Sequence, residues 1–246
     1  MTTDISIDLP PPASVLAIGA HADDVEFGAG ATLAKWATGG AAVRLLVLTD
    51  GSKGTWEPGA SLPALVAERR REQEKAAAVL GIQDVSFLDL VDGELTSGRP
   101  EQALVCAAIR TARPEVVIGH DPWQRYRLHP DHRHAGFLVT DAIVAARDPH
   151  FFPEQALEPH RPDRLLLFEA DAPDHFEHVD GFLDTKVEAL LCHRSQWETT
   201  MAIEAASPDA DAQREAFASR VIEEAAAAGA PAGLPHAEAF KLIEDL

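Results

Sequence analysis

The stretch "SVLAIGAHADDVE", residues 14–26, joins an apolar run to one histidine and three carboxylates. The run "SVLAIG" is typical of a buried strand, and "FGAGAT" continues from residue 27 as a glycine-rich turn. Charged groups beside a buried strand are costly unless they are paired or bind a metal. The set of His21, Asp23, Asp24 and Glu26 therefore indicates a functional site where the first strand ends.

Similar apolar runs recur along the chain and alternate with helical patterns. They predict strands over 15–18, 43–48, 85–88, 116–118 and 165–168, and helices near 30–38, 65–80, 101–111 and 135–146. The strand runs are continuously apolar, as expected when helices cover both faces of a sheet. The fold class that follows is α/β, a three-layer α/β/α arrangement with a mainly parallel, Rossmann-like sheet. Beyond residue 168 we expect mostly helix, over 182–193, 211–228 and 236–246.

The bulk composition excludes several classes of function. The chain has 246 residues, 46% of them hydrophobic, which suffices for one large folded domain. A net charge of −19 disfavours nucleic acid and anionic membranes as partners. Two cysteines form neither a disulfide framework nor a cysteine-type zinc site. Because no apolar run reaches membrane-spanning length and "MTTDISIDLPPPAS" lacks a signal-peptide pattern, we expect a cytoplasmic protein, and the sequence leaves a homo-oligomer open.

A strand followed by a glycine-rich turn and a helix also raises dinucleotide binding. Gly28 and Gly30 give G-x-G, but Leu33 occupies the third glycine position of the fingerprint. The carboxylates before the turn would repel a pyrophosphate from the N-terminus of the helix. We therefore interpret these glycines as positions where the first helix approaches the sheet closely.

Carboxylate and imidazole groups at the end of a strand suit a divalent metal. His21 and Asp24 are three residues apart, and a catalytic zinc site needs a third protein ligand and an open position. The segment "HDPWQRYRLHPDHRH", residues 120–134, follows the fourth predicted strand. In a doubly wound sheet the first and fourth strands are neighbours, so loops leaving their carboxyl ends face one crevice. We expect the third ligand within "HPDHRH", with His132 preferred, although the same residues also fit a helix start with Pro130 in its first turn.

In these motifs the chain resembles the PIG-L-type, LmbE-like family of zinc-dependent N-deacetylases. The family pattern A-H-P-D-D-x-E reads "AHADDVE" here, with Ala22 in place of the proline, and H-P-D-H stands at 129–132. Weaker similarities follow in order over nearly the whole chain: "TDG" at 49–51, "FLDLVDG" at 87–93, "HDPW" at 120–123, "HRSQ" at 193–196 and "EAF" at 238–240. We expect a flexible arm over 1–12, and the resemblance implies a single deacetylase domain over 13–246.

The resemblance implies that His21, Asp24 and His132 bind one Zn²⁺ per chain, with Fe²⁺ as the alternative metal. Such an ion activates water for attack on an amide. The implied function is hydrolysis of an N-acyl group, with N-acetyl on a glucosamine-containing small molecule favoured. Two alternatives stay open: an amidase that cleaves a larger acyl group, such as a thiol conjugate, and a metal-binding protein without catalysis.

The same resemblance implies the catalytic groups. Asp23 would be the general base, and His129 the general acid or oxyanion stabiliser. Asp131 would hold the His129 imidazole, which predicts a His129 pKa above its ordinary value. A full set of base and acid argues against a site that only binds metal.

Further residues have both a functional and a plain interpretation. Arg69, in "RRRE", is a candidate substrate contact or part of a solvated helix face, and Asp92, in "VDGEL", is a sugar contact or a turn residue. Glu26 is a second-layer residue of the site or a charge at a helix N-terminus. His175 and His178, in "HFEH", have helix-like spacing and are interpreted as surface residues. Arg127 stands where relatives that act on glucosaminyl thiol precursors often have a tyrosine, so the resemblance does not decide the substrate.

Overall fold

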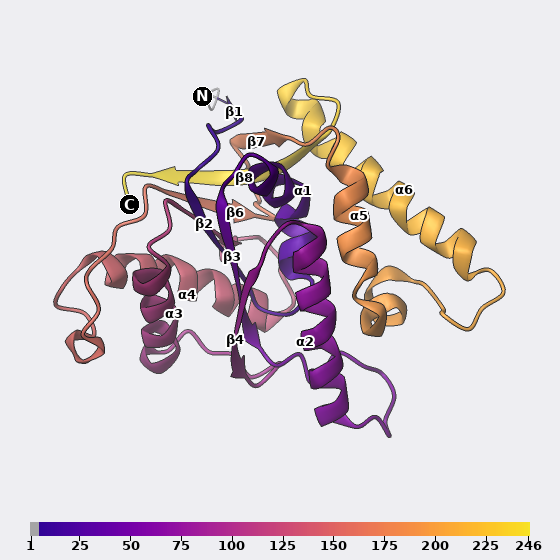
Figure 1. The fold of residues 1–246 in the computed structure, drawn as a ribbon, viewed down its shortest axis with the longest axis horizontal. Helices are drawn as coiled ribbons and strands as arrows, with labels where there is room; N and C mark the ends of the chain where they lie inside the picture. Colours follow the sequence, from indigo (N-terminus) through magenta and orange to yellow (C-terminus); the bar gives the residue numbers. More distant parts are fainter. Residues whose placement is uncertain (1–4) are drawn as a thin grey trace.

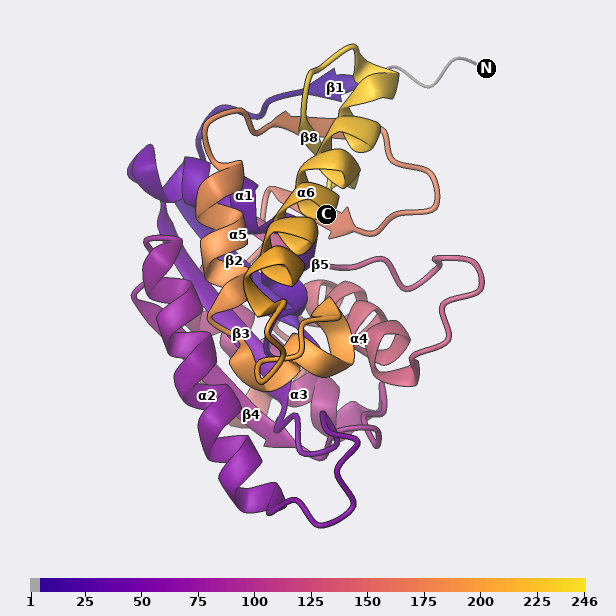
Figure 2. The same ribbon diagram turned by 90° about the vertical axis from the view of Figure 1, so that its right-hand side faces the viewer.

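The computed structural model describes residues 5–246, which form three layers around one eight-stranded sheet (Figures 1 and 2). The strands are β1 Ser6–Ile7, β2 Ser14–Gly19, β3 Ala42–Thr49, β4 Asp84–Leu90, β5 Val116–His120, β6 Arg164–Phe168, β7 His175–His178 and β8 Ala237–Glu244. Their order in the sheet is β1-β7-β8-β6-β5-β2-β3-β4. All pairings are parallel except those of β8 with β6 and β7, so the predicted α/β fold is confirmed.

Helices cover both faces of this sheet. They are α1 Asp24–Thr38, α2 Leu62–Val79, α3 Arg99–Ala112, α4 Pro130–Arg147, α5 Leu183–Leu191 and α6 Ala210–Gly229, with short turns η1 Pro153–Gln155, η2 Arg194–Gln196, η3 Trp197–Met201 and η4 Ala230–Ala232. Val15 and Ala17 of β2 pack in the core under α1, α2 and α5, whereas Leu16 and Ile18 pack against α3 and α4. Figure 1 shows α6 outside α5. Because both faces are covered, the central strands read as continuous apolar runs.

The strand order places the predicted site at one end of the sheet. β2 lies between β3 and β5, with Val15 opposite Val116 in parallel register. The segments that follow β2 and β5 therefore leave the sheet side by side, as predicted from the doubly wound pattern. At Gly28 a Cβ atom would overlap the ring of Phe168, which confirms that this glycine lets α1 approach the sheet, whereas Gly30 faces Lys186 of α5.

The C-terminal third differs from the sequence prediction. The helix expected over 236–246 is strand β8, which lies antiparallel between β6 and β7. Its Ala, Glu, Lys and Leu residues favour a helix, but pairing with two strands outweighs that propensity. The "HFEH" segment forms β7, where His175 is fully buried and its Nε2 lies 2.8 Å from Glu177 Oε1. His175 is therefore a core residue rather than a surface one, while His178 remains partly exposed.

Part of the segment expected to be a flexible arm is bonded to the sheet. Ser6–Ile7 pair with β7, and the Leu9 N–H donates to Glu177 Oε1 at 2.8 Å. Lys35 Nζ of α1 binds Asp8 Oδ1 at 2.8 Å. Residues 1–4, which the predicted arm also includes, lie outside the described residues.

A buried ion pair fastens α1 to the C-terminal strand. Glu238 of β8 accepts the backbone N–H groups of Ala31 and Thr32, at 3.0 and 2.7 Å. Lys186 Nζ of α5 donates to Glu238 Oε1 and to the Phe27 carbonyl, both at 2.7 Å. These contacts hold the helix that carries Asp24 in place behind the cleft.

Replacing Lys186 with Met is expected to lower the free energy of unfolding by about 3–5 kcal/mol, because it leaves a buried carboxylate without its cation. Urea denaturation monitored by circular dichroism measures this loss. The control is Arg44→Met, which removes an exposed partner of Asp84. That control is expected to cost about 1 kcal/mol or less. Equal losses in the two variants would contradict the assigned role of the Lys186–Glu238 pair.

Among residues 5–246, no helix is long and apolar enough to cross a membrane.

Candidate metal and catalytic centre

A cleft of about 710 Å³ opens at the carboxyl ends of the parallel strands. Segments far apart in the chain line it: those after β2, β3, β4, β5 and β6, together with η3 and α6. Its inner wall contains seven of the eight site residues predicted from the sequence: His21, Asp23, Asp24, Arg69, Asp92, His129 and His132. The eighth, Asp131, is fully buried directly behind this wall.

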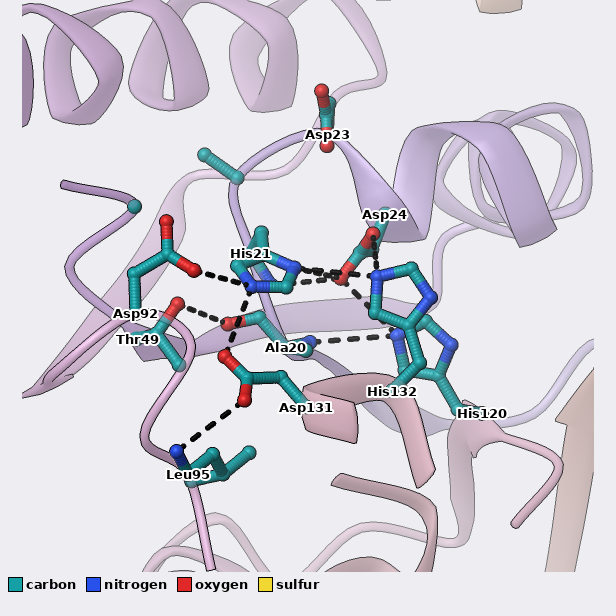
Figure 3. A network of polar contacts seen from close by, with 12 residues as sticks. Ala20, His21, Asp23, Asp24, Thr49, Asp92, Leu95, His120, Asp131 and His132 are labelled. Carbon is teal, nitrogen blue, oxygen red and sulfur yellow. Dashed lines mark hydrogen bonds and ion pairs between the residues drawn. The ribbon is translucent and has the colours of Figure 1, made fainter. Parts of the chain in front are cut away.

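The three predicted metal ligands lie together (Figure 3), and Asp24 presents a different carboxylate oxygen to each histidine. His21 Nδ1 lies 3.4 Å from Asp24 Oδ2, His132 Nε2 lies 3.2 Å from Asp24 Oδ1, and the two imidazole nitrogens are 3.3 Å apart. Ligand atoms around a four-coordinate Zn²⁺ lie about 3.3–3.5 Å apart, given bonds of about 2.0–2.2 Å. The donor set and its spacing therefore fit one small divalent ion.

His129 and His120 each join an alternative set of donors. His129 groups with His21 and His132, and His120 groups with Asp24 and His132. His120 ends β5, and its Nε2 lies 3.1 Å from Asp24 Oδ2. Its ring also stacks on that of His132, with centroids 4.5 Å apart. His120 thus orients two of the predicted ligands, a role that the sequence signalled only through the "HDPW" motif.

Two carboxylates orient the His21 ring from its far side. His21 Nε2 lies 3.0 Å from Asp92 Oδ1 and 3.2 Å from Asp131 Oδ2. A ring N–H directed at a carboxylate leaves the other nitrogen's lone pair free for a metal. Burial by itself lowers the pKa of His21, but hydrogen bonds to Asp131, Asp24 and Asp92 hold that pKa well above its ordinary value. Although burial opposes it, the same contact with His21 lowers the pKa of Asp92 to about 2.

The contacts of Asp131 correct the expected role of this residue. Asp131 contacts His21, and it also accepts hydrogen bonds from the backbone N–H groups of Gly93 at 2.7 Å and Leu95 at 3.3 Å. Its hydrogen bonds thus support His21 and the loop after β4, rather than the His129 imidazole. Burial, together with the neighbouring His21 and His132, lowers the pKa of His129. The expectation of a raised His129 pKa is therefore wrong.

Asp23 stands apart from the ligand network in Figure 3. Its backbone is left-handed, with φ 95°, and its N–H donates to Gln73 Oε1 at 3.0 Å. Non-glycine residues in this region are strained and cluster at functional sites. Burial raises the pKa of the Asp23 carboxyl to about 6, although Arg69, with Nη2 3.9 Å away, partly offsets this effect. Asp23 is thus a buried carboxyl group on the cleft wall that titrates close to neutrality.

Arg69 and Glu72 lie on a buried face of the charged α2 segment, whereas Glu68, Arg71, Glu74 and Lys75 are exposed. Arg69 is 4% exposed and donates to the Ala22 carbonyl at 2.8 Å and the Gly51 carbonyl at 3.1 Å. Glu72 accepts the N–H and the hydroxyl of Ser195, at 2.9 and 2.6 Å. This face of α2 therefore supports the "AHADD" turn and ties it to η2.

Glu26 is a buried carboxylate in the first turn of α1, so it stands at a helix N-terminus and also lies behind the site. It is 0% exposed, accepts a hydrogen bond from Gln73, and lies 3.8 Å from His193 Nε2. Gln73 also binds the Asp23 backbone, so Glu26 supports that turn from behind. His193 was missed as a site residue, and the "HRSQ" motif was its only signal.

Arg127 contacts His132 and Glu169 beside the predicted metal ligands. Its Nη2 binds Glu169 Oε2 at 2.5 Å, and its Nη1 lies 2.7 Å from His132 Nδ1. Glu169 also lies 3.3 Å from His120 Nδ1. This chain of contacts holds the second histidine ligand from the solvent side.

Comparison with known proteins gives relatives over most of the chain. Diacetylchitobiose deacetylase of Thermococcus kodakarensis is 36% identical over 186 residues, which cover 74% of this chain and 70% of that protein. 4-Oxalmesaconate hydratase of Pseudomonas putida is 28% identical over 204 residues, which cover 76% of this chain and 77% of that protein. The structure of N,N'-diacetylchitobiose deacetylase from Pyrococcus horikoshii, complexed with its inhibitor MPG, matches with a TM-score of 0.84 and 28% identity, covering 96% of this chain and 87% of that one.

Residues 16–143, more than half of the chain, match the PIG-L family, described as GlcNAc-PI de-N-acetylase. This range includes both sequence motifs and all of the predicted metal ligands. The chain belongs to the PIG-L family of de-N-acetylases.

Proposed function

We propose that this protein is a zinc-dependent hydrolase that removes the N-acetyl group from a glucosamine-containing small molecule. The observation that carries the proposal is the geometry of the cleft wall. His21, Asp24 and His132 present three donors at the spacing of one ion's ligand shell, and Asp23 stands beside them outside the network. The relatives named as deacetylases of acetylated amino sugars support the same activity.

Each group on the wall has a proposed task. A bound Zn²⁺ would supply Lewis-acid activation of water and of the acetyl carbonyl. Asp23 accepts the proton of the attacking water and later delivers it to the departing amine. His129, within reach of both histidine ligands, stabilises the oxyanion or acts as the acid. Arg69 and Asp92 are proposed substrate contacts because both line the cleft.

The test combines metal loading with a substrate panel. Metal-stripped protein is reloaded with Zn²⁺ or Fe²⁺ and incubated with N-acetylglucosamine, its glycosides and an N-acylated thiol conjugate. Release of free amine with one equivalent of acetate supports the proposal. Release of only a larger acid would identify the amidase alternative, and bound metal with no amine release would identify a metal-binding protein without catalysis.

Binding of Zn²⁺ at pH 7 is expected to release about one proton per ion, because ligands must be deprotonated. Hydrogen bonds to Asp131, Asp24 and Asp92 hold the pKa of His21 well above its ordinary value, which favours the protonated ring in the metal-free protein. The metal must displace that proton, so zinc affinity rises with pH. Calorimetric titration in two buffers of different ionisation enthalpy measures the release. An apparent binding enthalpy that is the same in both buffers would show that His21 is already neutral.

We also propose a cytoplasmic location. Cys106 and Cys192 are free thiols, which fits a reducing compartment.

A further inference from the structure

The cleft extends well beyond the proposed metal ligands. Its outer wall combines Trp56, from the segment between β3 and α2, with Thr199 and Thr200 of η3 and Glu224 of α6. Trp56 is 74% exposed, although aromatic side chains of this size are usually well covered in a folded protein. An indole that lines a cleft while open to solvent offers an apolar face to a ligand.

The polar groups of the outer wall suit hydroxyl groups. Thr199 and Thr200 carry hydroxyls that both donate and accept hydrogen bonds, and the Glu224 carboxylate accepts them. A pyranose ring has an apolar face of C–H groups and a rim of hydroxyls. One indole face together with hydroxyl and carboxylate partners matches both parts of such a ring.

The charges of the cleft disfavour an anionic group at this position. Lys53 and Arg69 are the basic residues among its described lining. Lys53 Nζ binds Glu94 Oε1 at 3.0 Å and the Asp92 carbonyl, and Arg69 binds the Ala22 and Gly51 carbonyls. Lys53 Nζ and both Nη atoms of Arg69 therefore already hold hydrogen bonds, whereas Arg69 Nε is buried without a partner. On the outer wall a phosphate or carboxylate of the substrate would instead meet the Glu224 carboxylate.

We propose that this outer wall is a second sugar subsite, with Trp56 as the stacking platform for a neutral ring attached to the acetylated glucosamine. The proposal rests on the proposed deacetylase function, and it narrows the substrate class to neutral glycosides. A ring seated on Trp56 anchors the far end of the substrate and so helps to hold the acetamide near Asp23.

Steady-state kinetics on paired substrates test the subsite. The Trp56→Ala variant is expected to lower kcat/KM for N,N'-diacetylchitobiose about tenfold more than kcat/KM for N-acetylglucosamine, the size expected for loss of an aromatic anchor. The Trp56→Phe variant keeps a stacking face and should restore most of the preference for the disaccharide. N-acetylglucosamine 1-phosphate should be a poorer substrate than the neutral methyl glycoside.

The matched control is Trp123→Ala. Trp123 is also exposed, at 58%, but it is not part of the cleft lining and packs edge-on against Phe137. This variant should keep the disaccharide preference of the parent protein. Equal losses on both substrates in Trp56→Ala, or a preference for the phosphorylated sugar, would overturn the subsite.

Binding to metal-stripped protein separates this proposal from the proposed function. Calorimetry with N,N'-diacetylchitobiose should show binding that Trp56→Ala weakens and Trp123→Ala does not. If Trp56→Ala weakens disaccharide binding but the metal-loaded protein releases no amine, the subsite proposal stands and the deacetylase proposal is refuted. Amine release with disaccharide binding that is insensitive to Trp56 would keep the deacetylase and refute the subsite.

Discussion

Replacing Asp23 with Asn is expected to lower turnover by about 10²–10⁴-fold while one metal ion stays bound per chain. The substitution keeps the size of the side chain and its left-handed backbone, which asparagine tolerates well. It removes the carboxylate that we propose as the acceptor of the proton from the attacking water. The ligand network is untouched, because Asp23 is no part of it.

The pH dependence of the parent enzyme provides a second readout for Asp23. Burial raises the pKa of this carboxyl to about 6, so it is ionised above that pH and protonated below it. Turnover should therefore fall as the pH drops through this value. Asp211→Asn, on the exposed surface of α6, is the control and should match the parent protein. Near-normal turnover of a metal-loaded Asp23→Asn protein would remove Asp23 from the mechanism.

Replacing His132 with Ala is expected to weaken metal binding by more than about 100-fold, because even the loss of an outer partner of a ligand costs about 10–100-fold. Activity at limiting zinc should fall with the metal content. Metal analysis after dialysis, together with a competition titration against a chelator, measures the effect. His236→Ala removes a histidine that pairs with Asp180 away from the cleft, and it should retain the metal. A His132→Ala protein with full zinc would show that His129 or His120 supplies the third ligand.

The central sheet was predictable from the sequence because each strand is buried on both faces. Runs such as "SVLAIG" need no partner information to be recognised, and β2, β3, β4, β5 and β6 all appear where they were expected. β8 was not predictable in this way. Its residues have helical propensity, and only the pairing with β6 and β7, distant in sequence, makes it a strand. The same holds for His175, whose burial depends on strand pairing rather than on local spacing.

The sequence predicted that His21, Asp24 and His132 lie together, because they stand in two short motifs that the strand order brings side by side. It did not predict the partners that orient them. Asp131 precedes His132 in the chain, yet it turns to His21, 110 positions away. Glu26, Gln73 and His193 meet only through the packing of α2 and η2 against α1. Such contacts depend on distances across the fold, which neither spacing nor composition encodes.

The central claim is tested most directly by adding Zn²⁺ stepwise to metal-stripped protein and measuring the rate at which acetate is released from N,N'-diacetylchitobiose. The geometry of His21, Asp24 and His132 predicts that activity rises linearly and reaches a plateau at one equivalent of zinc per chain. Release of acetate by the stripped protein, or no release at any zinc loading, would contradict a metal-dependent deacetylase at this site.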